Sequence, residues 1–171
     1  YWGKMMRGAC FVYSYTKDEK LYALLTQTVK EMLALVREDG RMSTYLPEEE
    51  FGGWDMWCRK YVLLGMQYFL EICQSEELKR RIIVSMCRQV DYIIRFVGPE
   101  KEGKKPIANT GVLIYRGANS ASILEPIVRL YSLTEEQKYL DFATYLVDAG
   151  VLDVANLYKL AFENQFKPYQ Y

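Results

Sequence analysis

Histidine, the commonest general base of enzymes, is absent from this sequence, which narrows the chemistry that its side chains could perform. Without histidine there is no Ser-His or Cys-His nucleophile pair. The four cysteines, at positions 10, 58, 73 and 87, show no Cys-x-x-Cys spacing, so the close Cys/His pairs typical of structural zinc are missing too. We therefore predict no metal site in this chain. Any reaction must use carboxylates, Lys, Tyr or Cys, or groups supplied from elsewhere.

Aromatic and polar side chains that could bind a ligand are concentrated in one long predicted loop, residues 38–54, and in the helix that follows it. Such a mixture suits a sugar ring, because flat apolar rings stack on its C–H face while polar groups bond its hydroxyls. Similar residues begin two further predicted helices. The predicted mouth contains Trp54, Asp55, Trp57, Arg59 and Tyr61, with Tyr1, Trp2 and Lys4 at the first helix and Tyr115, Arg116, Asn119 and Ser120 at the fifth.

Several of these residues also have a purely structural interpretation, which the sequence leaves open. Trp54 and Trp57 could staple the loop to the helix, and Asp55 is a natural N-cap. The run Glu48–Glu50 is expected to be a solvated charged segment. Glu125 would either line a site or pair with a neighbouring helix, since a buried glutamate needs a partner.

Composition and charge exclude several classes of protein. The chain has 171 residues, 50% of them hydrophobic, and its 22 basic residues balance its 22 acidic ones. This balance excludes a disordered or low-complexity protein and argues against a nucleic-acid partner, which usually needs a basic excess. No apolar run is long enough to span a membrane and no signal peptide is visible, so we predict no membrane partner and assign no compartment.

A repeat of helix pairs is expected to position the candidate residues. Thr16, Ser75 and Thr134 are 59 residues apart, and each could cap a helix through its hydroxyl group. Apolar residues four apart lie on both sides of each candidate cap, which is typical of helices with one buried face. The predicted helices cover 2–15, 17–37, 55–73, 76–97, 119–132 and 135–149, with a further helix at 153–164 and a possible short strand at 112–115.

The repeat also predicts the core and one irregularity. Leu24, Ile83 and Phe142 occupy equivalent positions after the three caps and are expected to be buried. Pro126 would kink a helix over 119–132, whereas a start near Glu125 would place it in the favoured first turn; we favour the longer helix.

The predicted loops differ in length in a regular way. Loops within each helix pair are short, whereas the loops between pairs, about 38–54 and 98–118, are long and fall at one end of the array. Binding groups concentrate on long loops carried by a rigid scaffold, so we expect the site at that end.

Several motifs, in this order and spacing, resemble the β-L-arabinofuranosidase family of glycoside hydrolases, long carried as a domain of unknown function. The resemblance covers nearly the whole chain. It rests on Trp2-Gly3-Lys4, Asp39-Gly40 followed by Thr44-Tyr45, Trp54–Tyr61, Ser122–Pro126, Tyr139–Ala143 and the tail Lys167–Tyr171.

The resemblance implies an all-α fold, an (α/α)6 barrel of six helical hairpins whose inner helices line the axis. Residues 1–171 would form a partial catalytic domain of about three hairpins plus one helix, about half of that ring. The family uses a cysteine thiolate held on zinc and a glutamate acid/base; we expect those residues, and the zinc, beyond Tyr171. The resemblance assigns substrate binding to Thr44, Tyr45, Trp54, Asp55, Arg59, Asn119 and Glu125.

The implied function is the carbohydrate-binding half of a glycoside hydrolase, inactive by itself, whose open side meets the missing half of the barrel or a second copy. Two alternatives stay open: a non-catalytic helical-repeat interaction module, and a sugar lyase or epimerase on a related toroid. The repeat of 59 residues is longer than the roughly 33–47 residues of common helical solenoids, which favours the hydrolase.

Overall fold

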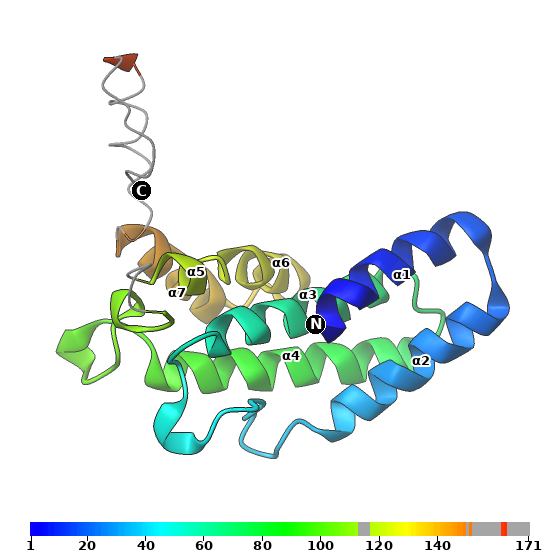
Figure 1. Cartoon of the computed structure of the whole chain (residues 1–171), viewed down its shortest axis with the longest axis horizontal. Helices are drawn as coiled ribbons and strands as arrows, with labels where there is room; N and C mark the ends of the chain where they lie inside the picture. The colour runs from blue at the N-terminus through cyan, green and yellow to red at the C-terminus, as the bar shows by residue number, and fades with distance from the viewer. Residues whose placement is uncertain (113–116, 150, 152–161, 164–171) are drawn as a thin grey trace.

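The computed structural model shows an all-α protein built from helical hairpins, which confirms the predicted fold class (Figure 1). It describes residues 1–112, 117–149, 151 and 162–163; the possible strand at 112–115 and the helix at 153–164 fall almost wholly outside them. The helices are α1 (Trp2–Thr16), α2 (Glu19–Ala34), α3 (Asp55–Leu70), α4 (Glu76–Phe96), α5 (Ala118–Ala121), α6 (Leu124–Thr134) and α7 (Gln137–Asp148), with short 3-10 turns at Pro47–Glu49, Glu100–Glu102 and Ile107–Asn109.

Three helices, α1, α3 and α6, run parallel to one another and form an inner layer. Phe11 of α1 contacts Tyr68 of α3, with ring centroids 5.3 Å apart, and Gln67 of α3 donates a hydrogen bond to the Pro126 carbonyl of α6. The outer helices α2, α4 and α7 each return antiparallel to the inner helix before them; in Figure 1 α4 runs beneath α3. All inner helices therefore begin at the same end, where the long loops lie.

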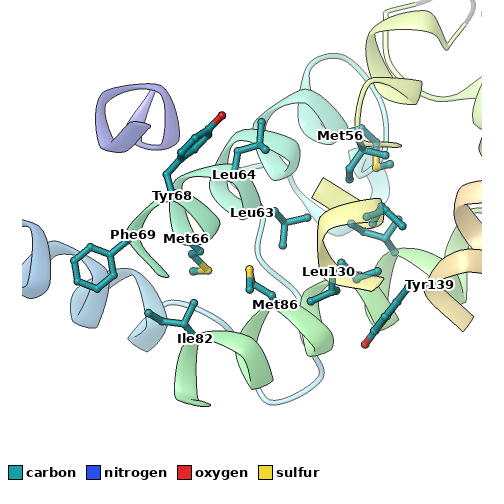
Figure 2. Packing of buried hydrophobic residues seen from close by; sticks show 14 of the residues in the cluster. Met56, Leu63, Leu64, Met66, Tyr68, Phe69, Ile82, Met86, Leu130 and Tyr139 are labelled. Atoms are coloured by element: carbon teal, nitrogen blue, oxygen red, sulfur yellow. The ribbon is translucent and has the colours of Figure 1, made fainter. Parts of the chain in front are cut away.

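Residues of α3, α4 and α6 make the centre of the core. Met66 and Phe69 on α3 and Ile82 and Met86 on α4 are completely buried, and Leu130 closes the cluster from α6 (Figure 2). The side of α3 toward α1 carries Tyr68 instead. The inner helices thus have one face in the core and one face along the inside of the array.

Two of the three predicted helix caps are wrong. The Thr16 and Thr134 hydroxyls each donate to the carbonyl four residues back, at 2.9 Å, so both threonines end a helix instead of starting one. A threonine hydroxyl can reach that carbonyl once the preceding helix extends over it. The residue after each threonine, Lys17 or Glu135, is left-handed with φ of 54° or 56°, which stops the helix.

The true caps lie at Asp18, Ser75 and Glu136. Asp18 accepts hydrogen bonds from the backbone N–H groups of Lys20 and Leu21 at 2.8 and 3.0 Å, and Ser75 accepts one from Leu78 at 3.2 Å, as predicted for this serine. The caps are therefore not evenly spaced, although the helix pairs do repeat.

The uneven caps shift the buried positions by one residue. Leu24 is 60% exposed where Leu25 is buried, and Ile83 is half-buried where Ile82 is completely buried. Leu25, Ile82 and Ala143 each lie seven residues after a true cap, and all three are buried. The prediction holds for Phe142, which is 5% exposed, and is wrong for the other two positions.

The predicted continuous helix over 119–132 is also wrong, because it breaks at Ser122 and Ile123 into α5 and α6. Pro126 lies in the first turn of α6, close to the alternative start near Glu125. A proline costs nothing there, since the N–H groups of a first turn have no partner within the helix. None of the described helices is long and apolar enough to cross a bilayer.

Candidate functional site

A buried network of charges fixes the long loop to the start of α3. Glu50 Oε1 accepts a hydrogen bond from Arg59 Nη2 at 2.8 Å and forms an ion pair with Arg41 Nε at 2.8 Å, while the Tyr92 hydroxyl donates to Glu50 Oε2 at 2.7 Å. Arg59 Nε also donates to Asp55 Oδ2 at 3.0 Å. Two arginines balance two carboxylates, so charges this deeply buried are all paired.

The network corrects two sequence-based interpretations. Glu48 and Glu49 are exposed as predicted, but Glu50 is only 8% exposed, so the run is not wholly solvated. Asp55 is not the N-cap of α3, a position that Trp54 holds. Its carboxylate instead accepts from the Ser43 hydroxyl at 2.6 Å and from a loop backbone N–H at 2.9 Å, besides Arg59. Both oxygens of Asp55 are thus already used within the protein.

Two adjoining cavities open where the long loop meets the first turns of α1 and α3. The larger, about 530 Å³, is lined by the loop and by both helices and includes Thr44, Asp55 and Arg59. The smaller, about 450 Å³, contains Trp54. Tyr1, Cys58 and Tyr61 line both. Each is large enough for a small ligand such as a sugar ring.

Only part of the predicted substrate-binding set exposes polar groups in these cavities. Thr44 is exposed, whereas Asp55 and Arg59 are 1% and 4% exposed and paired with each other. Tyr45 lines neither cavity: its hydroxyl accepts from the Trp54 backbone N–H at 3.0 Å. Asp55, Arg59 and Tyr45 therefore shape the site rather than present free groups to a ligand.

The two tryptophans of the mouth have features of a structural staple and of a ligand-binding surface. The rings of Trp54 and Trp57 meet edge to face at 5.8 Å, and Trp57 meets Tyr61 in the same way at 5.2 Å. Trp54 nevertheless stays 44% exposed at the edge of the smaller cavity. An aromatic row of this kind offers ring surface to a ligand while being held in place by its neighbours.

Asn119 lies at the same end of the molecule as Asp55 but outside both cavities. The backbone N–H of Gly111 donates to the Phe51 carbonyl at 2.8 Å, and a side chain at Gly111 would collide with Asn119 and Ser120. Neither amide atom of Asn119, nor the Ser120 hydroxyl, has a hydrogen-bond partner among the described residues, although Asn119 is only 8% exposed. Buried polar groups normally have a hydrogen-bond partner, so Asn119 is still a candidate ligand contact.

Glu125 is placed on the inner face of the array rather than in the cavities. It is exposed and forms an ion pair with Arg129 at 3.5 Å, one turn along α6. Among the predicted residues, Thr44, Asp55 and Arg59 thus share one cavity, Trp54 lies in the next, and Tyr45, Asn119 and Glu125 lie around them.

Glu50 and Arg41 are the residues that sequence reasoning missed at this end. A signal exists in Asp55 and Arg59, which are one turn apart at the start of a predicted helix. An arginine buried there needs more than one carboxylate to satisfy its planar group of donors, and the acidic run supplies the second.

The family resemblance implies a zinc site beyond Tyr171, and the described residues of this chain do not supply a ligand set for one. Within residues 1–112, 117–149, 151 and 162–163, no three Cys, Asp or Glu side chains come together as a ligand set. Cys10 and Cys73 are buried, Cys87 is half-buried, and Cys58 alone is exposed. Burial, and then the negative charge of Glu71, raises the pKa of Cys10 to about 12. The raised pKa disfavours the thiolate form that a metal would need.

Replacing Tyr92 by phenylalanine is expected to destabilise the protein by about 1–3 kcal/mol at pH 7, because the charged Glu50 carboxylate loses the hydroxyl group that donates to it. Burial, and then the bond to Glu50, raises the pKa of Tyr92 from 10.0 to about 12. The unfolded tyrosine releases its proton first, so this contribution is present below pH 10 and is lost between pH 10 and 12.

Urea unfolding at pH 7, 10 and 12 measures this difference. The gap between the wild type and Tyr92→Phe should narrow as the pH rises. Tyr15→Phe, at a side chain that is 92% exposed, serves as the control and should follow the wild type throughout. A gap that stays constant to pH 12 would contradict the role given to the Tyr92 hydroxyl.

Comparison with known proteins now adds to this geometry. A search of curated proteins found no match, and a search of solved structures found none. The family model described as "Beta-L-arabinofuranosidase, GH127 catalytic domain" matches residues 1–167. This span includes all the described helices and both cavities. The chain therefore belongs to the GH127 β-L-arabinofuranosidase catalytic-domain family of glycoside hydrolases.

Proposed function

We propose that this chain forms the carbohydrate-binding part of a glycoside hydrolase, with a sugar held where the inner helices begin. The observation that carries the proposal is the pair of adjoining cavities at the starts of α1 and α3, bordered by Trp54, Trp57 and Tyr61. Aromatic rings beside hydroxyl groups, such as that of Thr44, suit the alternating apolar and polar faces of a sugar. Family membership supports this reading over a non-catalytic repeat module or a lyase.

The catalytic groups are proposed to come from outside residues 1–171. A glycosidase needs two carboxylates flanking the bond, or a nucleophile together with an acid. The carboxylates at this mouth are already paired: Asp55 with Arg59, Glu50 with both arginines, and Glu125 with Arg129. The zinc and thiolate of the family would therefore belong to a further part of the barrel.

An exposed apolar side of α1 supports the idea of a further part of the barrel. Met5, Val12 and Tyr15 are between 51% and 92% exposed along this helix. An apolar helix face of this kind usually meets a partner. In an (α/α)6 barrel another hairpin would cover it, so we propose that three hairpins of the ring are described here; self-association is the competing explanation.

Trp54→Ala is expected to weaken the binding of methyl β-L-arabinofuranoside by about tenfold, or about 1.4 kcal/mol, because the sugar loses a ring surface. Isothermal titration measures the affinity, and a thermal melt of the same samples measures stability. Tyr15→Ala, at the opposite end of α1, is the control and should leave the affinity unchanged. Unchanged affinity with a lowered melting temperature in Trp54→Ala would make Trp54 a structural staple only.

An assay with aryl arabinofuranosides, zinc and a thiol reductant tests the catalytic part of the proposal. The 171-residue chain is expected to bind the sugar but show no turnover, whereas a longer protein carrying this sequence should hydrolyse it. Turnover by the 171-residue chain alone would place the catalytic groups within it and overturn this assignment.

A further inference from the structure

The inner face of α3 carries a row of aromatic side chains that the sugar-binding proposal does not fully use. Trp57, Tyr61 and Tyr68 lie on one side of the helix, as their spacing of four and seven residues requires. This side faces α1 and α6: Tyr68 contacts Phe11, and Arg129 of α6 lies over it. We call Trp57, Tyr61 and Tyr68 the inner aromatic row.

Two lysines from different helices lie over the first part of this row. Lys4 Nζ of α1 is 5.4 Å from the Trp57 ring centre and 4.6 Å from that of Tyr61. Lys60 Nζ of α3 is 4.9 and 5.1 Å from the same two rings. Both ammonium groups therefore share one pair of aromatic rings at the edge of the smaller cavity, which Lys4, Trp57 and Tyr61 line.

Two arginines continue the positive charge along the row. Arg7 of α1 lies 5.2 Å from the Tyr68 ring centre, and Arg129 of α6 lies 4.9 Å from it. Arg129 is the only one of these four cations with ion-pair partners among the described residues, at 3.5 Å from both Glu71 and Glu125. Three cations thus converge here without a paired carboxylate, in a chain whose total charge is zero.

The electrostatic environment of Lys60 shows that this convergence is unfavourable in the free protein. Burial lowers the pKa of Lys60; Glu125 acts in the opposite direction, and Lys4 and Arg7 lower the pKa further. Partly buried like charges held together cost stability, and sites that are kept at such a cost commonly serve binding. An added anion at this place would relieve the repulsion.

We propose that the ammonium groups of Lys4 and Lys60 bind the carboxylate of an acidic saccharide whose ring occupies the adjoining cavity against Trp54 and Trp57. The cavity of about 450 Å³ suits one sugar ring, and its aromatic lining distinguishes a saccharide from a bare anion. This inference rests on the proposed function, since it names the chemical class of the sugar. A carboxylate from another protein segment is the competing source of the same charge.

Binding of methyl α-D-galacturonate, its neutral methyl ester and sodium acetate to the protein tests the inference by isothermal titration. The three probes separate the charged sugar, the sugar without charge, and the charge without a sugar. We expect the galacturonate to bind at least tenfold more tightly than the ester or acetate in about 0.05 M salt, and to lose that preference in about 0.5 M salt, where ion pairs are screened.

Lys4→Met and Lys60→Met should each abolish the preference for the charged sugar, whereas Lys30→Met, the same change at an exposed lysine of α2, should retain it. Methionine keeps the unbranched apolar stem of lysine without the ammonium group, and removing a charge from this cluster should leave the melting temperature equal or higher. These variants are thus expected to fold. An equal loss in Lys30→Met would indicate general surface charge and overturn the inference.

Other outcomes separate this inference from the proposed function. Equal binding of the ester and the acid, or binding of methyl β-L-arabinofuranoside without binding of the galacturonate, would overturn the inference and leave the proposed function standing. Acetate binding as tightly as the galacturonate would make this an anion site with no sugar specificity, which also overturns it. If no saccharide binds, both fail.

Discussion

Glu50→Ala is expected to lower the free energy of unfolding by about 3–5 kcal/mol, because it removes one partner from a buried network of charges. Glu50 is only 8% exposed and contacts Arg41, Arg59 and Tyr92. Without it, two arginines share the single carboxylate of the network at Asp55, so one positive charge is left buried and unpaired. That desolvation cost explains why the loss should exceed that of a surface ion pair.

Urea unfolding monitored by circular dichroism measures this effect, with Glu49→Ala as the control. Glu49 is the exposed neighbour in the same acidic run, so its removal should change stability by less than about 0.5 kcal/mol. Glu50→Gln should resemble Glu50→Ala because it also removes the charge. If Glu50→Ala and Glu49→Ala unfold alike, the network does not hold the loop.

Ile82→Ala is expected to cost about 2–5 kcal/mol, since the substitution leaves a cavity in the centre of the core. Ile82 lies on α4 and is completely buried. Ile83, the adjacent residue with the same side chain, is half-buried, so Ile83→Ala should cost clearly less. The two variants test which residue of α4 is buried: Ile82, as the structure shows, or Ile83, as an even repeat of 59 residues predicts.

The same comparison can be made on α2, where Leu25→Ala should cost more than Leu24→Ala. Leu25 is 4% exposed and Leu24 is 60% exposed. Thermal and urea unfolding of the four variants together would decide the register of both outer helices. A larger loss at Leu24 and Ile83 than at Leu25 and Ile82 would restore the even repeat and contradict the observed caps.

The charge network links stability to the candidate site. Arg59 and Asp55 form part of the wall of the larger cavity, and Glu50 pairs with Arg59. Weakening the network should therefore loosen the cavity as well as the fold. Hydrogen bonds of this kind around a site hold it in shape, so we expect Asp55 and Arg59 to fix the shape of this cavity wall.

The local sequence was sufficient to predict the described helices and the hairpin order, but not the break between α5 and α6. Helical periodicity and short links between paired helices depend on residues within a few turns of each other, so they can be read without knowing the fold. The position of the long loops at one end followed from the same order. The first of them, residues 38–54, contributes residues to both cavities, whereas no described residue of 98–118 lines either one. The motifs also carried the family resemblance, which the family comparison confirms over residues 1–167.

Tertiary structure alone decided which caps and side chains are used. Thr16 and Thr134 have suitable hydroxyl groups, but only the extension of the preceding helices shows that these bond backward. The pairing of Glu50 with Tyr92 joins residues that are 42 positions apart. No local pattern reports such a contact, because a buried charge takes its partners from whichever elements the fold brings to it.

The cations over the inner aromatic row of α3 show most clearly what the sequence leaves open and the tertiary structure decides. The sequence places Lys4 at the mouth but assigns no ligand contact to Lys60 or Arg7. Only the parallel packing of α1 and α3 gathers these three cations on the inner aromatic row. Periodicity determines which side of a helix a residue occupies. The crossing of two helices determines what it faces, and electrostatic interactions depend on that distance through space rather than on separation along the chain.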